Sequence, residues 1–164
     1  NNYSVCVMFR HGNRQFLFTG DLEEEGEEKL AEKYDFSQVV FYKAGHHGSK
    51  TSSNTVLLSE IRPQICVASC VAGTPEYTKT EANQFPTQAF IDRISNYTDK
   101  VFVPLEVDYL EDGGYSFKQM NGNIVIKSYE TKVEVLCSNN SKFLKDTEWF
   151  NQYRTTPMAW KQVA

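Results

Sequence analysis

Short apolar strands alternate with helical segments in the first two thirds of this chain, and that alternation constrains the fold more than any other feature. The apolar runs of residues 39–43, 65–69 and 101–103 have almost no polar alternation, which is typical of strands covered on both faces. Helices are expected between them, at residues 23–34, 52–61 and 86–97. The pattern therefore predicts an α/β fold, in which a mixed sheet carries helices on the outside.

Two β-hairpins are expected beside this layer. Residues 5–10 and 15–19 are β-rich and flank a turn at 11–14, and residues 124–129 and 132–137 flank Glu130-Thr131. The tail is rich in aromatic residues but irregular, and we expect it to wrap the surface. We divide the chain into a main part, 1–129, and a terminal hairpin strand with its tail, 130–164, which belong to one domain.

Composition narrows the function classes. A chain of 164 residues can bury a real core, and its net charge of −4 gives no reason to expect general affinity for polyanions. No apolar run approaches the ~20 residues that span a bilayer. The first residues lack the basic start and apolar stretch of a signal peptide. The sequence thus indicates no targeting signal and does not distinguish a cytoplasmic from a cell-surface location.

The four cysteines are scattered through the chain. They lack the paired C-x-x-C spacing of a zinc knuckle, and a chain with this much core has little need of a disulfide framework. We expect reduced, buried thiols at Cys6, Cys66, Cys70 and Cys137.

Two short segments carry possible chemistry. Asp21 directly follows a predicted strand, so it lies at the strand's carboxyl edge, where α/β sheets bind ligands. Taken by itself, a role as the cap of the acidic helix that follows would be the better interpretation. His46 and His47 end another apolar strand and are flanked by glycines that allow close backbone approach. A common sheet edge for both segments predicts part of a mixed N/O metal site suited to zinc.

Together these segments resemble a known family. T-G-D-L-E-E-E-G-E, followed by G-H-H-G-S-K-T-S-S, is similar to the C-terminal half of the metallo-β-lactamase superfamily, most of all to the hydrolase domain of ComEC-type competence proteins. The resemblance covers residues 3–126. It implies the second half of an αβ/βα sandwich, built from two halves packed sheet against sheet.

The resemblance also implies roles for single residues. Asp21 would be the carboxylate that bridges two zinc ions, and His46 or His47 a late histidine ligand. We favour His47, because Gly48 follows it as in relatives. Asp21 and His47 would then be the catalytic residues. Beside the metals, Ser49, Lys50 and Thr51 could contact an anionic substrate, whereas Ser52 or Ser53 is expected to cap the following helix.

This sequence departs from the family pattern in two places. The first metal motif, H-x-H-x-D-H, is absent, and His11, the remaining histidine, falls in a hairpin turn. Gln84-Phe85 stands where relatives often carry Gly-His before a proline. Asp21 and one histidine supply fewer ligands than a stable zinc site requires.

Two functions remain open from the sequence. The chain is predicted to be a fragment of a zinc-dependent hydrolase, of the phosphodiesterase or nuclease kind, inactive until the missing N-terminal half is supplied. Its substrate would be nucleic acid or another phosphodiester. Alternatively, it is a non-catalytic binding or assembly domain that pairs through its exposed sheet, with a second copy as a possible partner.

Overall fold

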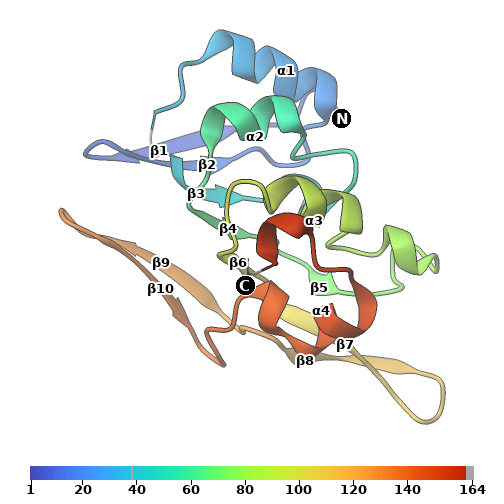
Figure 1. Ribbon diagram of the computed structural model, residues 1–164. Coiled ribbons are helices and arrows are strands. Elements are labelled where there is room, and N and C mark those ends of the chain that lie inside the picture. The colour runs from blue at the N-terminus through green and yellow to red at the C-terminus, as the bar shows by residue number, and fades with distance from the viewer. Residues whose placement is uncertain (38, 162–164) are drawn as a thin grey trace.

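The computed structural model of the 164-residue chain describes residues 1–37 and 39–161. Its main feature is a five-stranded sheet in the order β1-β2-β3-β4-β6 (Figure 1). β1 and β2 form an antiparallel hairpin, and β2, β3, β4 and β6 run parallel to one another. The strands are β1 (Val7–His11), β2 (Arg14–Phe18), β3 (Val39–Lys43), β4 (Ile65–Val67) and β6 (Val101–Phe102). The predicted α/β class and mixed sheet are confirmed at this level.

Three helices cover one face of this sheet (Figure 1). They are α1 (Glu24–Lys33), α2 (Thr55–Ile61) and α3 (Gln88–Ile94). The apolar side chains of α3, Phe90, Ile91 and Ile94, are fully buried. They pack with residues of the sheet and of α2, including Leu17, Tyr42, Leu57 and Leu58. In the described part of the chain, every helix is too short or too polar to cross a membrane.

The opposite face of the sheet is partly covered by a second hairpin. β9 (Ile124–Ser128) and β10 (Val133–Cys137) pair antiparallel, as the sequence predicts. Their Ile124, Ile126, Val133 and Val135 pack on a separate apolar cluster formed by Val40, Phe41, Ile65, Val67 and Phe102. Toward the β1 edge this cover ends, and Val7 and Phe9 are 39% and 60% exposed. The chain therefore covers only part of the face that was expected to be open.

A small third sheet was not predicted from the sequence. β5 (Val71–Ala72) pairs with β7 (Leu105–Tyr109), which pairs with β8 (Tyr115–Gln119). A tight turn connects β7 and β8, closed by a hydrogen bond from the Leu110 N–H to the Gly114 carbonyl at 2.9 Å. A strand as short as β5 leaves no periodic signal in the sequence, so only pairing with a distant strand reveals it.

The tail is more regular and more buried than predicted. It contains the helix α4 (Glu148–Tyr153), capped by the Thr147 side chain. Trp149, Phe150 and Trp160 join the core on the helix-covered face. The sequence shows no clear helical period here, because α4 has fewer than two turns. The cysteine prediction holds in part: all four are free thiols, but only Cys66 is buried.

Thr87 is predicted to contribute measurably to stability. Its hydroxyl accepts a hydrogen bond from the Phe90 N–H at 3.3 Å, which caps α3, and donates to the Gly48 carbonyl at 3.1 Å. Thr87→Ala should lower the free energy of unfolding by about 1 kcal/mol, as expected for loss of an N-cap. Chemical denaturation measures this change. Thr80→Ala is the matched control, because Thr80 precedes the helical turn Glu81–Asn83 without a side-chain cap.

Candidate functional site

The backbone brings the two predicted segments together. β2 and β3 are parallel neighbours, so their carboxyl ends lie at the same edge of the sheet. Asp21 follows β2, and the turn η1 (Gly45–Gly48) follows β3. The backbone N–H of His46 donates to the Gly20 carbonyl at 2.9 Å. This bond places the histidine turn directly beside Asp21.

The histidine turn has a strained backbone. His46 and His47 have φ angles of 45° and 59°, in the left-handed region that costs a non-glycine residue roughly 1–2 kcal/mol. Gly48 continues the turn at φ 82°, and a Cβ there would lie 2.9 Å from the Cβ of Pro86, so only glycine fits. Strained residues of this kind cluster at functional sites, which singles out this turn.

His47 is oriented by its own backbone surroundings. Its Nδ1 lies 2.6 Å from the Ser69 carbonyl oxygen, which can only accept a hydrogen bond. Nδ1 therefore carries the proton, and Nε2 keeps a free lone pair. Metal-binding histidines are commonly held in this way. Phe85 supports the ring from one side, with ring centroids 5.9 Å apart and planes inclined by 28°.

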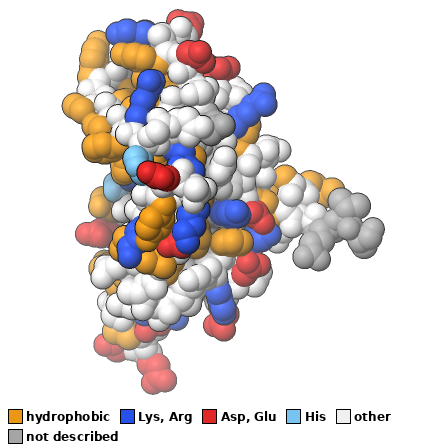
Figure 2. Space-filling view, turned by 90° about the vertical axis from the view of Figure 1, so that its left-hand side faces the viewer, with side chains coloured by type: hydrophobic (Ala, Val, Ile, Leu, Met, Phe, Trp, Pro, Cys, Tyr) orange, Lys and Arg blue, Asp and Glu red, His pale blue; other side chains and the backbone are white. Residues whose placement is uncertain are grey.

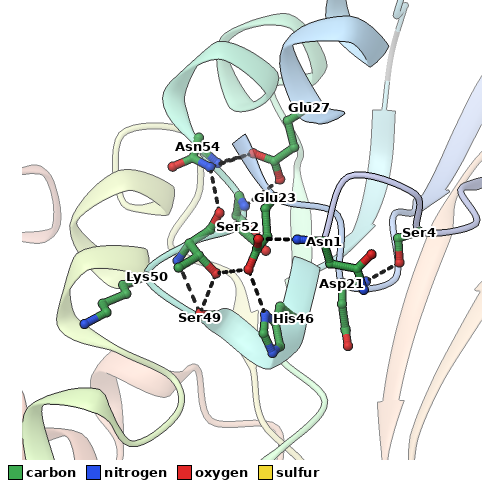
Figure 3. A network of polar contacts seen from close by, with 12 residues as sticks. Asn1, Ser4, Asp21, Glu23, Glu27, His46, Ser49, Lys50, Ser52 and Asn54 are labelled. Carbon is green, nitrogen blue, oxygen red and sulfur yellow. Dashed lines mark hydrogen bonds and ion pairs between the residues drawn. The ribbon is translucent and has the colours of Figure 1, made fainter. Parts of the chain in front are cut away.

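His46 has different neighbours. Its Nδ1 lies 4.0 Å from the Glu23 carboxylate, too far for a hydrogen bond, and has no other partner among the described residues. The Glu23 carboxylate also accepts a hydrogen bond from the Thr51 hydroxyl at 3.0 Å (Figure 3). His46 is thus directed toward an acidic side chain, unlike His47.

Asp21 is half-buried, and its backbone N–H donates to the Ser4 hydroxyl at 2.9 Å (Figure 3). Its carboxylate has no hydrogen-bond donor within the described ranges. Lys43, at the end of β3, lies nearby. Burial lowers the pKa of Lys43, and the negative charge of Asp21 partly opposes this shift. The sheet edge therefore joins a carboxylate, an ammonium group and an oriented imidazole.

The residues expected to bind substrate follow the histidine turn. Ser49 is 6% exposed, and its hydroxyl lies 3.1 Å from that of Thr51. Lys50 is exposed, and its ammonium group donates to the Asn83 side-chain carbonyl at 3.0 Å. Only Lys50 of these three directs a charged group into solvent.

The expected capping role of Ser52 or Ser53 is wrong. The N-cap of α2 is Asn54, and the Asn54 side chain makes no capping hydrogen bond. The Ser53 hydroxyl is buried and accepts from the Gly45 N–H at 3.1 Å. The Ser52 hydroxyl is buried without a partner in the described structure. The backbone N–H groups of Ser53 and Asn54 instead donate to Glu27, a residue of α1 that sequence reasoning did not single out.

The donor set fits zinc in kind but not in number. Asp21 and His47 offer oxygen and nitrogen ligands of the types that zinc prefers. Among residues 1–37 and 39–161, however, no group of three or more His, Cys, Asp or Glu side chains could hold a metal ion. His11 lies elsewhere and bonds the Ser128 hydroxyl at 2.8 Å.

The geometry predicts which nitrogen of His47 carries the proton. At a pH where imidazole is neutral, long-range ¹H–¹⁵N spectra should show the Nδ1–H form for His47, because the Ser69 carbonyl accepts that proton. His46, with no such acceptor, serves as the internal comparison. An Nε2–H form at His47 would contradict the assigned orientation.

Comparison with known proteins gives partial matches. The chain is 33% identical to Recombination protein 2 of Haemophilus influenzae over 101 residues, covering 62% of this chain and 12% of that protein. It is 43% identical to Competence protein ComA of Neisseria gonorrhoeae over 87 residues, covering 51% and 12%. ComE operon protein 3 of Bacillus subtilis is 32% identical over 69 residues, which cover 42% of this chain and 9% of that protein.

No protein-family profile and no solved structure matches the chain. The matched region spans about a tenth of the length of these curated relatives. The chain is therefore related to one part of the competence and recombination proteins.

Proposed function

We propose that this chain forms the second half of a zinc-dependent hydrolase domain of the metallo-β-lactamase type and acts on phosphodiesters. The carrying observation is the bond from the His46 N–H to the Gly20 carbonyl, which places the histidine turn beside Asp21 at one sheet edge. The relation to competence proteins supports the same proposal, because the two segments resemble the hydrolase domain of that class.

In this proposal Asp21 and His47 are the ligands that this chain contributes. The Asp21 carboxylate would hold zinc through oxygen, and His47 would hold it through Nε2, because the Ser69 carbonyl accepts the proton of Nδ1. Zinc, when bound, supplies an activated water at neutral pH. The remaining ligands come from a partner half, because two ligands fall short of the three or four that zinc needs.

The residues after the histidine turn would bind the substrate. The exposed ammonium group of Lys50 is held by Asn83 and can contact a phosphate oxygen. The Ser49 hydroxyl accepts from the Thr51 N–H and lies 3.1 Å from the Thr51 hydroxyl, so these two residues hold the backbone on both sides of Lys50. Positive and negative side chains intermix on the face in Figure 2. Substrate recognition would therefore be local, through a phosphodiester of a small molecule or a nucleic acid, rather than through a long basic surface.

A second candidate is an assembly domain that uses its open sheet face. Val7 and Phe9 of β1 remain exposed where the β9-β10 cover ends. Such a face can pack against the N-terminal half of the fold or against a second copy of this chain. In the hydrolase proposal the same face meets the missing half, so both candidates share this contact.

The hydrolase proposal predicts a strict dependence on the missing half. With zinc and a chromogenic phosphodiester, the chain by itself should show no turnover above background. Joined to a half that carries H-x-H-x-D-H, it should become active. If the chain alone turned over the substrate at the rate of the joined protein, the claim that it holds only part of the metal site would be contradicted.

The joined protein also separates the histidines. His47→Ala should lower activity and bound zinc by more than about a hundredfold, because it removes a ligand. His11→Ala should leave both unchanged, since His11 is the last residue of β1 and lies at the end of the hairpin opposite Asp21, in strand and not in the turn that the sequence predicted. If His47→Ala kept its full zinc content and His46→Ala lost zinc, His46 rather than His47 would be the zinc ligand. An inactive joined protein that scatters light as a stable complex would favour the assembly domain.

A further inference from the structure

One carboxylate in the first turn of α1 is fully buried and has no part in the proposed ligand set. Glu27 is 0% exposed, whereas its neighbour Glu28 is exposed. The Glu27 carboxylate accepts hydrogen bonds from the backbone N–H groups of Ser53 and Asn54 at 2.6 and 2.7 Å, and from the Asn54 side chain at 3.0 Å (Figure 3). Burying a carboxylate costs free energy unless such donors surround it, so this placement requires an explanation.

A cation binds the same segment through its carbonyl groups. Arg93 of α3 donates to the carbonyl oxygens of Ser53 and Ser52 at 2.9 Å, of Lys50 at 3.1 Å and of Ser49 at 3.4 Å. Burial raises the pKa of Glu27, while the backbone donors and Arg93 favour its charged form. Residues 49–54 are thus held through their N–H groups by an anion and through their carbonyl groups by a cation.

Hydrogen bonds connect this segment to the histidine turn. The Ser53 hydroxyl lies 2.9 Å from the hydroxyl of the buried Tyr42. Both hydroxyl oxygens accept from the Gly45 N–H at 3.1 Å. Gly45 directly precedes the two left-handed histidines. A strained turn of this kind persists only when its surroundings leave it no alternative, and these contacts supply that constraint.

We propose that Glu27 is a positioning residue of the candidate site, which acts with Arg93 through Ser53, Tyr42 and Gly45 to hold the histidine turn in its strained form. The inference rests on the proposed function, because it assigns Glu27 a role in presenting His47 to a metal. Glu27 itself does not contact the metal or the substrate.

The test compares Glu27→Gln with the exposed control Glu28→Gln in the chain as it stands. The amide introduced by Glu27→Gln keeps the side-chain shape but offers one acceptor oxygen in place of two. Two readouts are taken: the imidazole ¹⁵N shifts of His47 without metal, and the dissociation constant for Zn²⁺ alone, from shift changes at Asp21 and His47. Thermal unfolding is followed in parallel.

We expect Glu27→Gln to shift or broaden the His47 signals and to weaken Zn²⁺ binding about tenfold, the scale seen for residues that orient metal ligands. Glu28→Gln should change neither. Lower thermal stability with unchanged His47 signals would overturn the inference and leave Glu27 a structural residue. Should the wild-type chain bind too little Zn²⁺ to measure, the metal-free His47 signals decide.

Tyr42→Phe provides a second route if Glu27→Gln does not fold. It removes one acceptor of the Gly45 N–H and leaves the Glu27 bonds in place. Unchanged His47 signals in Tyr42→Phe would then overturn the inference. His47→Ala distinguishes a failure of this inference from a failure of the proposed function. If His47→Ala still binds Zn²⁺ at Asp21, the assignment of His47 as a ligand is contradicted. If His47→Ala loses Zn²⁺ binding but Glu27→Gln has no effect, only the positioning role of Glu27 is contradicted.

Discussion

A buried carboxylate on α1 and a half-buried guanidinium on α3 hold the same short segment of backbone, and the geometry of the candidate site depends on that arrangement. Glu27 binds the N–H groups of Ser53 and Asn54, while Arg93 binds carbonyl groups between Ser49 and Ser53. Charge-assisted hydrogen bonds are roughly twice as strong as neutral ones. They help to offset the cost of a turn in which two successive histidines have left-handed backbones.

The sheet contributes the second constraint. Because β2 and β3 are parallel, the residues that follow them reach the same edge, and the bond from His46 to Gly20 joins the two segments there. The Ser69 carbonyl at the end of the next strand then orients His47. Neighbouring strands thus supply a carboxylate, an imidazole and the acceptor that fixes its tautomer. Helices α1 and α3 hold the loop between them.

The second face of the sheet is only partly covered. β9 and β10 cover its centre, yet the β1 edge leaves Val7 and Phe9 exposed. The residues described here bring too few metal ligands together for a closed zinc site. In the proposed two-half hydrolase, this apolar edge would meet the other half, which would also supply the remaining ligands.

The strands of the five-stranded sheet, the two expected hairpins, the α/β class and the approach of Asp21 to the histidine turn were predictable from the sequence, because apolar periodicity, turn residues and adjacent histidines are local signals. The helix in the tail, the two-residue strand β5 and the role of Glu27 were not. Glu27 stands in a run of acidic residues, and nothing local separates it from its exposed neighbours. Only packing of α1 against α2 buries that one carboxylate and gives it backbone donors 26 residues further along the chain.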